Sequence, residues 1–202
     1  MRFLSHLFLL VCLYPSALYP QATQNRPGAD QESKPPSSGV VNQVPMTVTP
    51  AFWPLNLKQL VDASDVIIKG EVEAILGSRK QGISAQTDLQ ISVSQFFKGD
   101  KDKLKDRKVI ISQHGGRVGN EEFICENDPM MQLGEEYYFF LKADEQKDVP
   151  DFGFPRYYIR GIWAGRIRVE DKKIKVKPSQ YFARDFHEMS SDDFEYEILT
   201  LK

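Results

Sequence analysis

Two short runs of alternating apolar and polar residues constrain the fold of this chain more than any other sequence feature. The runs span residues 66–75 and 88–97, and the polar residues between them predict a loop. In the first run Val66, Ile68 and Val72 share one parity, whereas charged residues take the other. Successive side chains of a strand point to opposite faces of a sheet, so this period of two indicates half-buried strands. Because antiparallel sheets commonly bury one face and expose the other, the runs predict an antiparallel sheet.

Further strand-like segments follow along the chain. Residues 109–111 form a short apolar run, residues 137–141 form an aromatic run, and residues 166–177 alternate across a turn as a hairpin does. Gly70 interrupts the first alternating run. A glycine in the middle of a strand marks a bulge or a tight coil, so we expect the sheet to curl at this point.

A helix is expected at each end of this β-rich region. Asn56 precedes an apolar stripe of Leu57, Leu60 and Val61, and Ser190 precedes an acidic first turn typical of a helix start. The fold class predicted is therefore mainly β. We expect a small OB-like closed or partly open antiparallel barrel, with a short helix before the first strand and a C-terminal helix.

The first residues have the layout of a secretory signal peptide. Arg2 precedes an apolar run over residues 3–13 that is too short to span a bilayer comfortably, and small residues follow it. We interpret residues 1–22 as the signal peptide, residues 23–50 as a disordered linker poor in aromatic residues, and residues 51–202 as the barrel domain. The expected localisation is secreted or periplasmic, with no transmembrane span in the mature chain. Lipid anchoring through Cys12 is disfavoured because Val11 stands where a small residue should precede a modified cysteine.

If Cys12 leaves with the signal peptide, Cys125 is the remaining cysteine and an intramolecular disulfide is excluded. The side chain is expected to be a small buried hydrophobe. A reactive thiol needs a neighbouring cation to lower its pKa, whereas Glu122 and Glu126 are anionic.

Several motifs together resemble known proteins. The residues that carry the resemblance are 63–72 (ASDVIIKGEV), 91–93 leading to 97–99 (FKG), 115–116, 133–137 (LGEEY) and 139–141. They resemble a group of exported bacterial proteins of unassigned function, and the opening is also similar to the OB-like barrel of netrin and tissue metalloproteinase-inhibitor modules. The resemblance covers about residues 57–141 and implies an OB-like barrel. Those inhibitors chelate zinc through an N-terminal cysteine held by disulfides, and this chain lacks the pairing cysteines that such a mechanism needs.

Motifs for catalysis and metal binding are missing from the sequence. It has no G-x-S-x-G elbow, H-E-x-x-H motif, phosphate-binding glycine loop or C-x-x-C pair. His114 precedes a Gly pair as in the oxyanion-hole motif of esterases, but without the serine elbow we interpret it as a strand-end or turn residue. The acidic residues Glu121, Glu122, Glu126 and Asp128 lack EF-hand spacing, so we expect a solvated acidic loop. The sequence predicts no catalytic residue, no metal site and no cofactor.

Two surface features remain as candidates for binding. The first combines aromatic residues and arginines that could stack on a sugar ring or anchor a protein partner, unless the aromatic residues close the barrel core. Its members are Phe152, Phe154, Arg156, Tyr157, Tyr158, Arg160 and Trp163. The second is a basic strand face that could meet an anionic envelope polymer or be an ordinary solvated face. Its members are Arg166, Arg168, Lys173, Lys175 and Lys177.

Composition narrows the class of partner. A net charge of −2 and an isoelectric point near 6.0 argue against a nucleic-acid ligand, because proteins that bind nucleic acid usually present a dominant positive surface to the phosphates. We therefore expect an exported, non-catalytic binding or adaptor module of the cell envelope or extracellular space, with an envelope protein or glycan as partner. An envelope-associated hydrolase, or a protease-inhibitor-like module without the zinc-chelating cysteine, is the alternative. The oligomeric state is left open.

Overall fold

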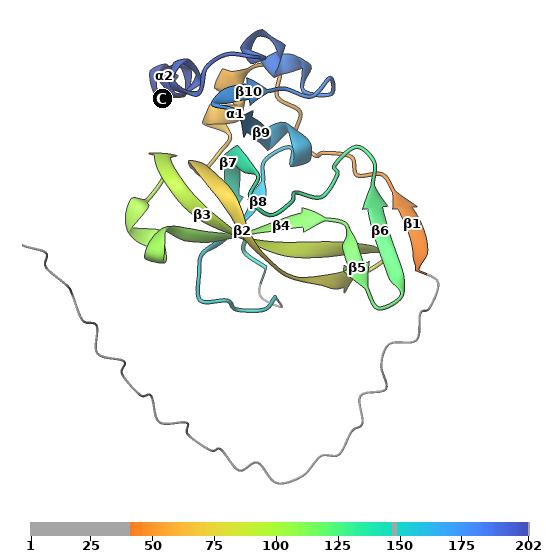
Figure 1. The fold of residues 1–202 in the computed structure, drawn as a ribbon. Coiled ribbons are helices and arrows are strands. Elements are labelled where there is room, and N and C mark those ends of the chain that lie inside the picture. The colour runs from red at the N-terminus through yellow and green to blue at the C-terminus, as the bar shows by residue number, and fades with distance from the viewer. Residues whose placement is uncertain (1–40, 147–148, 202) are drawn as a thin grey trace, which may run out of the picture. The chain divides into compact units, whose positions relative to one another are not determined.

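A closed ring of five strands organises the fold (Figure 1). The computed structural model describes residues 41–146 and 149–201. Around the ring, each strand pairs with the next, and the last pairs back to the first. The strands in this order are β2 (Val66–Gln81), β3 (Ser84–Lys98), β4 (Lys108–His114), β8 (Arg156–Ile159) and β7 (Glu136–Ala143). The β4–β8 pair is parallel, which the predicted antiparallel barrel did not include, and the other pairs are antiparallel. The chain is mainly β, with a ring of strands, a short helix before that ring and a C-terminal helix, which confirms the predicted fold class.

Further strands extend this arrangement. β9 (Arg166–Glu170) pairs with β7, and β10 (Lys173–Lys175) pairs with β9. A separate three-stranded sheet has the order β1 (Asn42–Met46), β6 (Glu121–Cys125) and β5 (Gly116–Val118).

A strand lies before the predicted domain boundary at residue 51. β1 lies within the segment predicted as a linker, and it pairs in parallel with β6. The predicted signal peptide and residues 23–40 of the predicted linker lie outside the described residues.

Both predicted helices are present. In α1 (Leu57–Asp62) the Asn56 side chain accepts a hydrogen bond from Gln59 N, and in α2 (Ser191–Thr200) the Ser190 side chain accepts one from Asp193 N. These caps satisfy backbone donors that a helix start leaves free. Short 3₁₀ segments connect other elements: η1 (Lys101–Lys103), η2 (Lys105–Arg107), η3 (Ile162–Gly165) and η4 (Tyr181–Phe186). No helix of the described residues combines the length and apolarity that crossing a bilayer requires.

Two apolar layers meet at β7. Phe139 belongs to the cluster inside the ring with Ile68, whereas its neighbour Phe140 belongs to a second cluster with Leu60 of α1 and Phe194 of α2. Because successive side chains alternate, β7 is buried on both faces, and this explains its continuous aromatic run.

The β2–β3 hairpin is longer than predicted. Residues 76–81 and 84–87, which were expected to form a loop, continue the two strands to a turn at Gly82 and Ile83. The predicted special role of Gly70 is confirmed, because Lys69 pairs with Gln95 and Gly70 with Val93, a shift in register. A Cβ atom at Gly70 would lie 2.6 Å from the Ser92 carbonyl oxygen, so β3 approaches this position too closely for a side chain.

Candidate functional site

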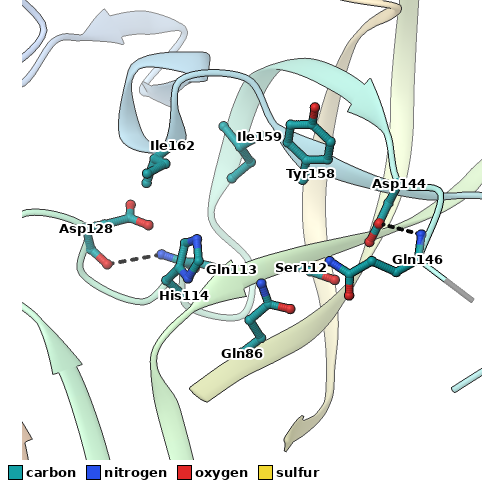
Figure 2. Close-up of a pocket in the computed structure, with 10 residues that line it drawn as sticks. All are labelled: Gln86, Ser112, Gln113, His114, Asp128, Asp144, Gln146, Tyr158, Ile159 and Ile162. Atoms are coloured by element: carbon teal, nitrogen blue, oxygen red, sulfur yellow. Dashed lines mark hydrogen bonds between the residues drawn. The ribbon is translucent and has the colours of Figure 1, made fainter. Parts of the chain in front are cut away.

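A polar groove lies beside the C-terminal end of β4. One part of it is a cavity of about 140 Å³ between β4, β8, the segment after β6 and the segment after β7 (Figure 2). Two adjoining hollows share Asp144 and Gln146 with this cavity, and one of them extends to Phe152 and Phe154. We call these three adjoining hollows the polar groove. The cavity is lined by Gln86, Ser112, Gln113, His114, Asp128, Asp144, Gln146, Tyr158, Ile159 and Ile162.

Strand register brings the cavity residues together. Gln86 of β3 is paired with His114 of β4, and Ser112 of β4 is paired with Tyr158 of β8. Leu89 and Ile111 point into the ring, so the alternating neighbours Asp88 and Ser112 point outward toward the groove.

Asp88 forms a buried ionic network under one side of the groove. Its carboxylate accepts hydrogen bonds from Arg156 Nη1 at 2.5 Å, from Ser112 Oγ at 2.7 Å, and from Arg79. Burial alone would raise the pKa of this carboxyl, but the hydrogen bonds from Arg156, Arg79 and Ser112 outweigh it and hold the pKa below its ordinary value. Arg156, predicted as a binding residue, is thus engaged in joining β8 to β3, and its side chain is 8% exposed.

A second buried ion pair lies beside the cavity. Asp128 Oδ1 is 2.6 Å from Arg166 Nη2, and the two side chains are 1% and 2% exposed. The interpretation of Asp128 as part of a solvated acidic loop was therefore wrong. Burial raises the pKa of the Asp128 carboxyl, and the positive charge of Arg166 opposes that rise.

His114 is the last residue of β4, in agreement with its interpretation as a strand-end residue. Burial lowers the pKa of its imidazole below the ordinary value, against the opposing charge of Asp128. The ring is therefore neutral at pH 7.

Cys125 is buried, as predicted. Its Sγ donates a hydrogen bond to Asn127 Oδ1 at 3.0 Å, and burial raises the pKa of the thiol. A raised pKa keeps the thiol protonated and unreactive.

The predicted binding segment divides between packing and the groove. Tyr157 and Trp163 are 4% and 5% exposed and belong to the interior. The guanidinium of Arg160 lies 4.3 Å from the centre of the Phe52 ring and covers it. The structure places Phe152, Phe154 and Tyr158 along the groove. Phe152 and Phe154 are partly buried there, and Tyr158 is exposed.

The predicted basic strand face is largely neutralised. Lys173 and Lys175 both pair with Glu188, and Arg168 pairs with Glu135 and Glu170. The interpretation as an ordinary strand face fits these pairs better than a free positive surface does.

Sequence reasoning missed Gln86, Asp144 and Gln146 as groove residues. Gln86 lies in the segment predicted as a loop, and its outward position in a strand was therefore not considered. Asp144 directly follows the aromatic strand β7, and a polar residue at a strand end is the signal that could have identified it.

The described residues contain no group of three or more His, Cys, Asp or Glu side chains arranged to hold a metal ion. No protein-family model matches the chain, and no curated protein matches it either. Any assignment of function therefore depends on the geometry of the groove.

Proposed function

We propose that this chain is an exported, non-catalytic binding module whose ligand occupies the polar groove. The observation that carries the proposal is a polar cavity that adjoins hollows lined by partly exposed aromatic side chains. Ligand sites combine apolar and aromatic walls with a few polar groups that set orientation. In the groove Phe154 and Tyr158 supply the aromatic surface, and Asp144 supplies a polar group.

The position of the groove supports this proposal. OB-folds bind their ligands on the face of the second and third strands, between the loops that join strands 1 and 2 and strands 4 and 5. Counted from β2, these strands correspond to β3 and β4, and the second loop corresponds to the segment between β7 and β8. The groove is lined by Gln86 of β3, by residues of β4 and by the segment between β7 and β8, so it overlaps this position, although the β2–β3 turn does not line it.

The groove offers little support for the hydrolase alternative. A serine nucleophile needs a general base within hydrogen-bond reach. Ser112 is the serine that lines the cavity, and its hydroxyl donates to Asp88 rather than to His114. The binding module is therefore the function that the geometry supports best.

Export is the second part of the proposal, and its support is the signal-peptide pattern of residues 1–22. Mass spectrometry of the protein recovered from the envelope or culture medium tests it. We expect an N-terminus near Ala17 or Ala22. A chain that retains Met1 in the exported fraction contradicts cleavage.

Substitutions in the groove test the binding function. Phe154→Ala and Tyr158→Ala should reduce recovery of a partner or glycan from envelope extract while leaving the melting temperature unchanged. Tyr196→Ala is the matched control, because Tyr196 is 67% exposed on α2 and does not line the groove. Equal recovery by all three variants would refute the site, and turnover of an ester, amide or glycoside that His114→Ala abolishes would favour the hydrolase.

A further inference from the structure

Several polar groups that line the cavity of the polar groove are already engaged within the protein. The Ser112 hydroxyl donates a hydrogen bond to Asp88. The Gln113 amide nitrogen donates to the backbone carbonyl oxygen of Asp128, whose carboxylate pairs with Arg166. These side chains hold strands and loops together, so recognition of a ligand depends on the other polar groups of the lining.

These other groups include both donors and acceptors. The Gln86 side chain points into the cavity (Figure 2), and only its oxygen has a partner, since it accepts a hydrogen bond from Arg79. The neutral His114 imidazole has one donor nitrogen and one acceptor nitrogen, and neither has a partner within the described residues. The same holds for the Tyr158 hydroxyl and for Asp144 Oδ2, which is a buried acceptor. This mixture suits a ligand whose own groups both donate and accept.

The described residues that line the groove offer an anionic ligand no unpaired positive charge. Two of them are permanent cations, and both are engaged, Lys142 with Asp65 and Arg156 with Asp88. The His114 imidazole is neutral because burial lowers its pKa. A phosphate, sulfate or carboxylate group would lose its hydration here without gaining an ion pair, whereas a neutral ligand needs none.

The shape of the groove and its aromatic residues suit sugar rings. The cavity has a volume of about 140 Å³, similar to that of an engineered cavity that binds benzene, so it has room for one six-membered ring. The adjoining hollow of about 240 Å³ is lined by Phe152 and Phe154 and shares Asp144 and Gln146 with the cavity. An aromatic ring offers a large apolar face, and the C–H groups of a second sugar ring can pack against it.

We propose that the polar groove binds a neutral glycan, with one sugar ring in the cavity beside Gln86 and His114 and the next ring against Phe152 and Phe154. Each sugar hydroxyl both donates and accepts hydrogen bonds, which matches the groups that the protein leaves unused. The centre of a protein–protein interface is apolar, whereas most residues that line this cavity are polar, so a glycan fits better than a protein partner. This inference rests on the proposed function and adds to it the class of the ligand.

A microarray of neutral, sialylated and sulfated glycans, probed with the full chain, tests the proposal. Binding to neutral glycans is expected, with weaker signals from the anionic ones. The neutral glycan with the strongest signal is then titrated in solution and followed by two-dimensional NMR. Saturable shifts of the backbone amide signals of Gln86, His114 and Phe154 are expected. Absence of binding to every neutral glycan, a preference for anionic glycans, or shifts confined to residues outside the groove would overturn the proposal.

Substitution of Gln86 makes the test specific to the cavity. Gln86→Glu keeps the oxygen that accepts from Arg79 and removes the amide donor, so the Kd of the titrated glycan should rise about three- to tenfold. Gln95→Glu is the matched control, because Gln95 is an exposed residue of the same strand that does not line the groove, and its Kd should equal that of the wild type. Equal Kd values for the two variants would overturn the proposal.

A second variant keeps the test decisive if a melting curve shows that Gln86→Glu is unfolded. Phe154→Leu retains a partly buried apolar side chain and removes the aromatic face, so it should raise the same Kd about three- to tenfold. A Kd equal to that of the wild type would overturn the placement of a sugar ring there. If no glycan binds while Tyr158→Ala still reduces recovery of a protein partner, the ligand class is wrong and the binding function stands.

Discussion

Replacement of Asp88 by Asn should destabilise the protein by about 3 kcal/mol. The Asp88 side chain is 3% exposed and is shared between Arg156, which is 8% exposed, and Arg79, which is 22% exposed. Removal of one partner from a buried ion pair costs about 3–5 kcal/mol, because the remaining charge loses its compensation. We expect the lower end of this free-energy range for two reasons. Arg79 can turn toward solvent, and the amide oxygen that the substitution introduces at position 88 can still accept one hydrogen bond. For a domain of this size, each kcal/mol shifts the melting temperature by about 2–4 °C, and the expected fall is about 6–12 °C.

Denaturant unfolding followed by circular dichroism measures this effect. The midpoint should fall while the slope of free energy against denaturant stays constant, since the folded state keeps its surface. Asp65→Asn is the control, because Asp65 forms a more exposed ion pair with Lys142 and should cost less than about 1 kcal/mol. Equally small effects of the two substitutions would refute the view that the Asp88 network is buried and structural.

Other predictions follow from the same structure. The pKa of Asp88 is lowered in the folded state, so its contribution to stability is present above the unfolded pKa of about 3.9 and is lost as the pH falls through the folded value. Asp88→Asn should therefore flatten the acid side of a plot of unfolding free energy against pH. An unchanged acid side would contradict this expectation. Gly70→Val should cost about 1–3 kcal/mol through overlap with the Ser92 backbone, whereas the exposed Glu73→Gln should be nearly neutral, and equal melting temperatures would count against the close approach. Tyr157→Ala should cost about 3–5 kcal/mol because this ring packs inside the barrel, and a melting temperature as high as that of the wild type would place Tyr157 outside the core.

Local features of the fold could be predicted because their causes are local. The alternation of Val66, Ile68 and Val72 predicts a buried face, and all three lie in the cluster inside the ring. Asn56 and Ser190 predict the helix starts because a capping side chain satisfies backbone groups only two or three residues away. Gly70 could be identified because a strand interior tolerates glycine chiefly where the backbone bends or approaches a neighbour.

The candidate site could be predicted only in part. Phe152, Phe154 and Tyr158 were expected to bind a ligand, and they line the groove. Their neighbour Tyr157 has the same chemistry but points into the ring, since alternate residues of β8 face opposite sides. Residue type alone cannot tell which of two neighbouring tyrosines is buried and which is exposed, whereas the pairing of β8 with β4 and β7 decides it.

The sequence by itself determined the strand periodicity, the helix caps and the strand irregularity at Gly70, because each depends on a few adjacent residues. Only the tertiary structure decided that β7 closes the ring, that β1 pairs with β6, and that Asp88 meets Arg156. In the sequence Asp88 occupies an outward strand position that is typical of a solvated residue. It is buried because Arg156 reaches it across β4, and contacts between residues so far apart depend on how the whole chain packs rather than on any local pattern.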